Sequence, residues 1–272
     1  MPPAALDAAG VRHTRAGADA RIVSLVPSIT ETLFALGLER QIVGRTGFCV
    51  HPRDKVQAVR KVGGTKAVKL DAIRALGPTH LIVNIDENER ETVDQLRAFV
   101  PHVVVTHPLT PRDNLALYAL LGAIFGREHE ARRLGDALEA RLQEAAASSF
   151  AAQNVLYLIW REPWMTVARD TYIAAMLRLV NWQTLPDLQG GVAGATRYPA
   201  LDFDDARWLA QVERILLSTE PYRFTSAHRD ALGRDPRLAG KRIELIDGEM
   251  TSWYGVRAIE GIGYLLRYAA GT

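Results

Sequence analysis

Aromatic and charged side chains follow several short apolar runs of this 272-residue chain. Three of its five tryptophans, Trp160, Trp164 and Trp253, stand in such positions, with arginine and glutamate residues beside them. Aromatic walls with a few placed polar groups are typical of a pocket that holds a large, flat and partly apolar ligand. Core packing is the alternative role for each of these rings, and the residue types alone leave both open.

Cys49 and His51 form a second group that could do chemistry. They are two residues apart, so on extended backbone their side chains point the same way. Thiolate and imidazole suit a soft or borderline metal ion, which requires a third and a fourth ligand. The alternative is a half-buried thiol beside a turn histidine. A nucleophilic pair fits less well, because this spacing supplies no base with an orienting partner.

The run Gly63-Gly64-Thr65-Lys66 could present backbone N–H groups and an ammonium group to an anion. It lacks the form of a phosphate-binding loop, and a plain turn explains the glycines equally well. Lys66, Arg161 and Arg197 would together attract carboxylates or phosphates, unless they are ordinary solvated charges.

Acidic residues open two predicted helices. Asp71 stands in the first turn of a helix over 70–76, and Asp204 and Asp205 open a helix over 203–210. The positive end of the helix dipole favours a carboxylate in the first turn. This effect alone can account for the three aspartates, without any role in binding.

These residues are positioned by short apolar strands that alternate with helices, which indicates parallel sheets covered on both faces. In the first half we predict strands at 21–26, 41–44, 80–84 and 102–106, helices after Ser28 and at 70–76 and 88–99, and a loop over 45–66. In the second half we predict strands at 154–160, 213–218 and 242–247, helices at 171–180, 203–210, 226–232 and 255–269, and an irregular stretch at 182–200.

Between these halves, the stretch from Asp113 to about Ser149 contains no proline and has apolar residues at helical spacing. It predicts one helix of about 30–35 residues, which would be about 45–50 Å long. The expected fold is therefore α/β, with two Rossmann-like lobes joined by one long backbone helix. The expected segments are an N-terminal lead-in at 1–20, a lobe at 21–111, the linking helix at 112–150 and a second lobe at 151–272.

Composition excludes several classes of protein. Hydrophobic residues make up 48% and charged residues 24%, which is ordinary globular usage. The net charge of +2, with no basic block, argues against nucleic-acid binding, and one cysteine excludes an internal disulfide.

The first 20 residues do not resemble a signal peptide, and the longest apolar stretch, 115–125, is too short to span a membrane. We therefore expect a cytoplasmic protein as written, or a periplasmic one if the N-terminus was trimmed.

Several segments resemble the helical-backbone (class III) substrate-binding proteins of ABC importers for cobalamin, haem and ferric siderophores. The resemblance covers nearly the whole chain from Asp7 and is best over the first 110 residues. It rests on RIVSLVPSITE at 21–31, KVGGT at 61–65, LDAI at 70–73, LGPTHLIV at 76–83 and VDQL at 93–96. Segments at 48–52, 64–66, 160–164, 197–199, 216–222 and 247–254 look like a cobalamin-binding-protein-like branch.

The resemblance implies two α/β lobes on one long helix, with the ligand held between the lobes by aromatic residues from both. It also implies that a carboxylate on each lobe docks on arginines of a permease; Asp71 matches the first, and Asp204 or Asp205 the second. Thr65 stands where the cobalamin-importer proteins place a ligand-stacking tryptophan, which argues against cobalamin.

The hypothesis is a monomeric binding protein that needs no cofactor and captures cobalamin, haem or a ferric siderophore, for an ABC importer or as a cytosolic carrier. The alternatives are a cytosolic enzyme that acts through Cys49 with His51 or Glu87 with Lys66, and a partner-binding domain without a ligand-sized pocket. The candidate ligand-binding residues are Phe48, Cys49, His51, Thr65, Lys66, Glu87, Asn88, Trp160, Arg161, Trp164, Arg197, Tyr198, Glu220, Tyr222, Glu249, Trp253 and Tyr254.

Overall fold

The structure, a computed structural model, describes residues 5–191, 193–203 and 207–271. The chain forms two compact units. The first contains the residues up to 108 together with 112–139 and 254–257; the second contains 109–111, 140–253 and the residues from 258 onward.

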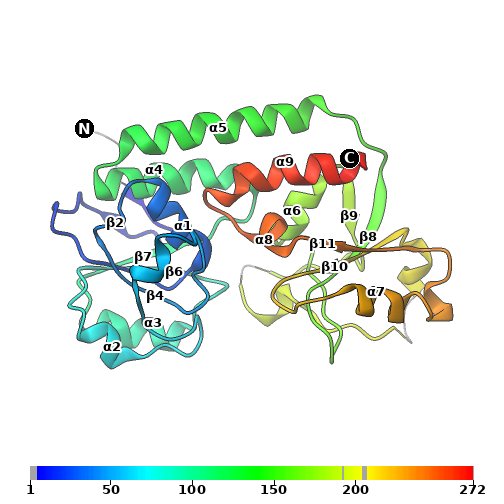
Figure 1. The fold of residues 1–272 in the computed structure, drawn as a ribbon, viewed down its shortest axis with the longest axis horizontal. Helices are drawn as coiled ribbons and strands as arrows, with labels where there is room; N and C mark the ends of the chain where they lie inside the picture. Colours follow the sequence, from blue (N-terminus) through cyan, green and yellow to red (C-terminus); the bar gives the residue numbers. More distant parts are fainter. Residues whose placement is uncertain (1–4, 192, 204–206, 272) are drawn as a thin grey trace. The chain divides into compact units, whose positions relative to one another are not determined.

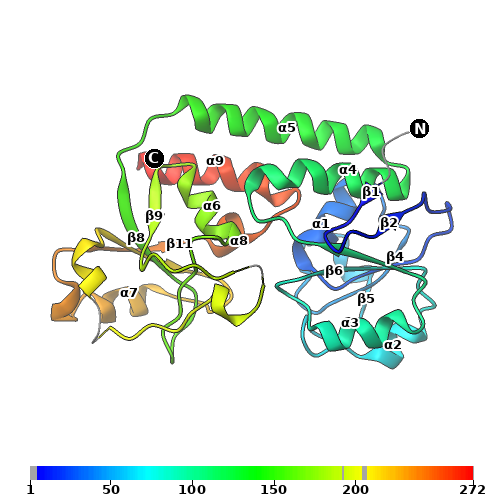
Figure 2. The ribbon, with the colours of Figure 1, turned by 180° about the vertical axis from the view of Figure 1, so that it is seen from behind.

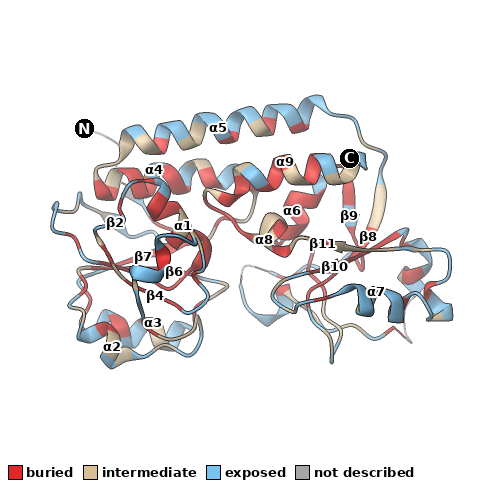
Figure 3. Ribbon diagram, viewed as in Figure 1, coloured by how far each residue is buried: buried red, intermediate tan, exposed pale blue. Residues whose placement is uncertain are grey.

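The first unit is built on a parallel five-stranded sheet with the order β5-β4-β3-β6-β7. Its strands are β3 (Ile22–Ser24), β4 (Ile42–Arg45), β5 (Arg60–Lys61), β6 (His80–Asn84) and β7 (His102–Thr106). Helices α2 (Leu70–Arg74) and α3 (Arg90–Arg97) cover one face, and α1 (Pro27–Ala35) and α4 (Asn114–Phe125) cover the other (Figures 1 and 2). The central strands are buried on both faces, as a parallel sheet between helices requires (Figure 3).

A small antiparallel hairpin, β1 (Ala5–Leu6) and β2 (Arg12–His13), is attached to the edge strand β7. The buried carboxylate of Asp7 accepts hydrogen bonds from the N–H of Val105 at 3.0 Å and of Ala9 and Val11 at 2.9 Å. Asp7 therefore both shapes the turn and joins it to the sheet.

His80, the first residue of β6, lies buried at the start of the sheet. Its ring stacks on that of His102 at a centroid distance of 4.7 Å and meets the edge of Phe125 at 5.2 Å. Burial first, and then the charges of His102 and His13, lower the pKa of His80 to about 4. The imidazole is therefore held neutral at physiological pH.

We expect this histidine to make folding sensitive to mild acid. In the unfolded chain His80 takes up a proton near pH 6.5, whereas in the folded chain it does so near pH 4. Its contribution to the free energy of unfolding is therefore complete above pH 6.5 and is lost as the pH falls toward 4, by at most about 3 kcal/mol. Denaturant unfolding between pH 7 and 4 should show a flatter decline in His80→Phe than in the wild type. The same substitution at exposed His129 should leave the decline unchanged; equal slopes for all three proteins would contradict this role.

The predicted single helix over 112–150 is wrong in one respect, because the structure divides it into α4 and α5 (Glu128–Ala147). Gly126 ends α4 in the left-handed conformation, with φ +64°. A Cβ atom on Gly122 would lie 2.6 Å from that of Ala131, so glycine there permits the close return of the chain. Helix α5 remains a long helix of 20 residues, of which 128–139 belong to the first unit and 140–147 to the second.

The second unit contains a parallel four-stranded sheet with the order β11-β10-β8-β9. Its strands are β8 (Gln153–Leu158), β9 (Trp182–Thr184), β10 (Arg214–Ser218) and β11 (Arg242–Ile246), and its helices are α6 (Tyr172–Arg178), α7 (Ser226–Leu232), α8 (Gly248–Ser252) and α9 (Arg257–Ala270). Helix α7 covers one face of the sheet, and α6, α8 and α9 lie on the other (Figure 1). Strand β9 lies in the stretch predicted to be irregular, and helix α8 lies between the predicted strand at 242–247 and helix at 255–269, where no helix is predicted.

Short 3₁₀ turns complete the chain at Val56–Ala58, Pro111–Asp113, Ala195–Arg197, Arg207–Gln211 and Pro236–Leu238. The fourth of these contains residues 207–210 of the helix predicted over 203–210. The predicted α/β fold with parallel sheets is confirmed.

Candidate functional site

Three loops at the carboxyl ends of β4, β5 and β6 are tied together in the first unit. The N–H of Gly47 donates to the carbonyl of Gly63 at 2.7 Å, and the amide of Asn88 donates to the carbonyl of Thr65 at 3.0 Å. We call residues 46–55, 62–69 and 85–90 the first loop surface. Asn88, predicted to contact ligand, is buried, and its amide joins two of these loops.

Large apolar side chains are exposed at these strand ends. Among the described residues, those on the first loop surface are Phe48, Val50 and Ile85, with exposed fractions of 62%, 37% and 36%. In the second unit Trp160, directly after β8, is 41% exposed. Apolar side chains left in water at the carboxyl ends of parallel strands favour a ligand site there.

Cys49 does not face this surface. Its side chain is fully buried, and the hydroxyl groups of Thr30 and Thr46 lie 3.1 and 3.2 Å from its Sγ. Burial raises the pKa of the thiol. His51 is half-buried, and no group of three or more His, Cys, Asp and Glu side chains in the described ranges could hold a metal ion. Among the described residues, no such group therefore completes the metal pair proposed from Cys49 and His51.

We expect Cys49 to react slowly with a thiol reagent in the folded protein. A buried thiol with a raised pKa supplies little of the thiolate that attacks the reagent. The rate should rise by at least about 100-fold in denaturant, as followed by release of the coloured leaving group of a disulfide reagent. A fast reaction in the native protein would show instead that the thiol is accessible.

Glu87 and Tyr254 form a hydrogen bond within the first unit. The Tyr254 hydroxyl donates to the Glu87 carboxylate at 2.5 Å, and the tyrosine is only 7% exposed. Both were candidate ligand residues. The structure shows that they contact each other, which fixes the loop after β6 against the residue that follows Trp253.

In the second unit, Trp160 and Tyr222 lie at the carboxyl ends of the neighbouring strands β8 and β10. Their rings meet edge to face at 5.5 Å, and the N–H of Tyr222 donates to the carbonyl of Ile159 at 3.3 Å. We call residues 159–164 and 219–222 the second loop surface. Its exposed aromatic ring is that of Trp160, whereas Tyr222 is half-buried beneath it.

The other candidate aromatics of this unit are more enclosed. Trp164 is half-buried and stacks on Phe224 at 6.1 Å, so it belongs largely to the core. Trp253 is 7% exposed, and its indole N–H lies 3.1 Å from both carboxylate oxygens of Glu220. Glu249 is half-buried in the first turn of α8. The indole of Trp253 therefore contacts the Glu220 carboxylate within the second unit.

The three basic residues expected to attract anions differ in their surroundings. Arg197 is 1% exposed and donates to the backbone carbonyls of Gly191 at 2.7 Å and Asp170 at 3.1 Å, so it shapes a loop. Tyr198, which follows it, is half-buried. Arg161 lies 3.4 Å from the Glu162 carboxylate. Lys66 is exposed on the first loop surface.

Of the predicted docking carboxylates, Asp71 is exposed in the first turn of α2. Asp204 and Asp205 lie outside the described residues.

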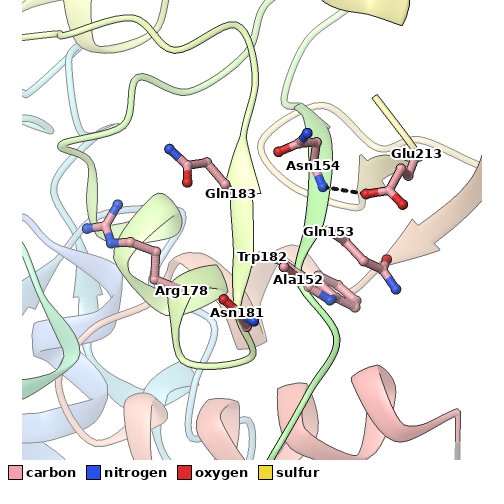
Figure 4. A pocket seen from close by; sticks show the side chains of 8 residues that line it. All are labelled: Ala152, Gln153, Asn154, Arg178, Asn181, Trp182, Gln183 and Glu213. Carbon is pink, nitrogen blue, oxygen red and sulfur yellow. Dashed lines mark hydrogen bonds between the residues drawn. The ribbon is translucent and has the colours of Figure 1, made fainter. Parts of the chain in front are cut away.

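A shallow cavity of about 300 Å³ lies at the opposite, amino ends of β8, β9 and β10 in the second unit (Figure 4). Two of its polar side chains are engaged within the protein: the Glu213 carboxylate accepts from the Asn154 N–H at 2.9 Å, and the side-chain amide oxygen of Gln153 accepts from the Arg214 guanidinium at 3.0 Å. We therefore place the candidate site at the carboxyl-end loops.

Sequence reasoning missed a buried hydroxyl group network behind the second loop surface. The Tyr157 hydroxyl lies 2.6 Å from that of Thr251 and 3.1 Å from that of Ser218. Burial raises the pKa of Tyr157 to about 12. In the sequence, each of these three hydroxyl residues only stands among apolar residues. That pattern does not predict that the three hydroxyl groups lie close together.

A sequence profile of the periplasmic binding protein family matches residues 22–239. The chain belongs to this family. Its members are transport substrate-binding proteins and not enzymes, so we do not retain an enzyme acting through Cys49 with His51 or Glu87 with Lys66.

Individual proteins agree with this assignment. An uncharacterized ABC transporter substrate-binding lipoprotein of Bacillus subtilis (strain 168), YvrC, is 24% identical over an alignment of 251 residues that covers 89% of this chain and 77% of that protein. The periplasmic heme-binding protein RhuT from Roseiflexus sp. RS-1 superposes with a TM-score of 0.76 at 23% identity, over 92% of this chain and 97% of that one. The periplasmic vitamin B12 binding protein BtuF of Vibrio cholerae gives a TM-score of 0.73 at 17% identity, over 92% and 96%.

Membership of the family makes this chain a substrate-binding protein that acts with an ABC permease on a small-molecule ligand. Family members act outside the cytoplasm, which favours the second of the two locations expected from the sequence. No helix within the described ranges is both long enough and apolar enough to cross a membrane.

Proposed function

We propose that this protein captures a metal chelate or a tetrapyrrole-like ligand, such as haem, cobalamin or a ferric siderophore, and delivers it to an ABC importer. The observation that carries the proposal is the exposure of Phe48 and Trp160 at the carboxyl ends of the two parallel sheets. Large, flat and partly apolar ligands are held by aromatic side chains of this kind.

The structural neighbours support this ligand class. RhuT is described as a heme-binding protein and BtuF as a vitamin B12 binding protein, and both share the fold of this chain. Within the class we propose cobalamin last, because the resemblance implies that Thr65 stands where the cobalamin-importer proteins place a ligand-stacking tryptophan. We propose Asp71, exposed on α2, as a contact with the permease.

The proposal is tested by titrating the purified protein with haemin, cyanocobalamin and a ferric siderophore while following tryptophan fluorescence. We expect saturable quenching by at least one of them, because Trp160 is exposed where we place the ligand. Absence of quenching and of any calorimetric signal with all three would contradict the proposed ligand class.

A further inference from the structure

The charge of this nearly neutral chain is strongly segregated. Residues 45–69 contain seven Lys and Arg and one Asp, a formal charge of +6, whereas the whole chain carries +2. All other residues together therefore carry −4. This segment runs from the end of β4 to the start of α2 and contains two of the three loops of the first loop surface. Its basic residues are Arg45, Arg53, Lys55, Arg60, Lys61, Lys66 and Lys69.

Arg45 is a fixed charge behind this surface. It is 2% exposed, and its guanidinium donates to the backbone carbonyls of Val56 at 3.0 Å, Thr46 at 3.1 Å and Cys49 at 3.0 Å. These acceptors are uncharged. In the part of the chain that the structure describes, no carboxylate pairs with Arg45, so its charge is screened less than that of a solvated arginine.

Among the exposed cations of the segment, Lys55 has an acidic partner and the others have none in the described ranges. Lys55 lies 3.6 Å from the Glu39 carboxylate. Across residues 5–191, 193–203 and 207–271, no ion pair involves Arg53, Arg60, Lys61, Lys66 or Lys69. Lys66 directly follows Thr65, and the Thr65 carbonyl accepts a hydrogen bond from the Asn88 amide. This bond fixes the backbone next to Lys66 on the first loop surface.

Loop 85–90, the third loop of this surface, contributes Asp86, Glu87, Glu89 and Arg90, a formal charge of −2, so the three loops together with Arg45 carry +2. Glu87 accepts the hydroxyl hydrogen of Tyr254, and Asp86 lies 3.4 Å from the ring of His107. Glu89 is the exposed carboxylate of this loop. The second loop surface differs, because its Arg161 is paired with Glu162.

We propose that the first loop surface recognises an anionic group of the ligand, a carboxylate, phosphate or catecholate, with Lys66 as the contact and Arg45 as the charge behind it. This inference rests on the proposed function and narrows it to chelates with a net negative charge. An ammonium group binds such anions as a point charge, and a fixed buried cation adds attraction without losing side-chain entropy on binding.

Matched ligand pairs test this inference. Haemin, which carries carboxylates, is compared with haemin dimethyl ester, and an anionic ferric tris-catecholate with a neutral ferric trihydroxamate, at about 20 and about 200 mM salt. We expect the anionic member of the bound pair to have a Kd at least about 10-fold lower, and the advantage to shrink in the higher salt. Lys66→Gln should weaken its binding about fivefold, Lys66→Arg should retain it, and Arg132→Gln on exposed α5 should have no effect.

The outcomes separate the two proposals. Equal Kd values for charged and neutral partners, with Lys66→Gln unchanged, would overturn the anionic site while leaving chelate binding intact. No binding of any chelate, cyanocobalamin included, would overturn the proposed function itself.

Discussion

Replacing Arg257 by alanine is expected to lower the free energy of unfolding by about 3–5 kcal/mol. Arg257, the first residue of α9, donates through two nitrogens to the carboxylate of Glu31 on α1, at 2.5 and 3.0 Å. The two side chains are only 8% and 17% exposed. Removing the guanidinium leaves a largely buried carboxylate without its charged partner, which costs more than the pair contributes when intact.

The exposed pair Arg141–Glu144 provides the control. These side chains are 40% and 51% exposed, so Arg141→Ala should cost less than about 1 kcal/mol. Arg257→Met with Glu31→Met should recover much of the loss, because no charge is then left buried. Urea unfolding of the four proteins measures these differences. Equal midpoints for Arg257→Ala and Arg141→Ala would show that the buried pair does not support the first unit.

Replacing Trp160 by alanine is expected to raise the Kd of the bound chelate by about 30-fold or more. The indole is 41% exposed and braced by Tyr222, so it offers a rigid apolar face at the carboxyl end of β8. Its removal should scarcely change stability, because the ring is not part of the buried core.

Leu188 is a suitable control for this variant. It lies in the same unit, is 40% exposed and is distant in sequence from both loop surfaces. Calorimetric titration should give a wild-type Kd for Leu188→Ala and a weakened one for Trp160→Ala. If both variants bind as the wild type does, Trp160 does not contact the ligand.

The elements with continuous apolar runs could be predicted from the sequence. The predicted strands at 80–84 and 102–106 have the bounds of β6 and β7, because buried parallel strands are uniformly apolar and end at polar turns. The break at Gly126 was missed, since the apolar pattern continues past it, although a glycine directly after an apolar helical run is itself a stop signal. Strand β9 is three residues long and contains Gln183, so periodicity cannot detect it.

The positions of candidate residues at strand ends could be predicted, but their orientations could not. Cys49 stands in the expected loop and Asn88 shortly after the expected strand, yet both side chains are buried and contact residues distant in the sequence. Arg197 likewise turns to backbone carbonyls. Which atom satisfies a polar side chain depends on the tertiary fold, and a single sequence does not encode it in any local pattern.

The uneven distribution of charge, by contrast, can be recognised from the sequence and the order of the strands alone. Seven basic residues within 45–69 can be counted directly, but their meaning depends on the loops after β4 and β5 forming one surface. The hydrogen bond between these two loops is therefore the structural observation that relates the number of basic residues to the anionic ligand that we propose.

The central claim is that this protein carries a metal chelate. Native mass spectrometry of the protein purified from the organism that makes it tests this most directly. We predict a species heavier than the 30.0 kDa chain by the mass of one tetrapyrrole or ferric chelate, released on denaturation with its characteristic visible absorption. A retained ligand that contains neither a metal nor a tetrapyrrole, such as a sugar or a peptide, would contradict the account.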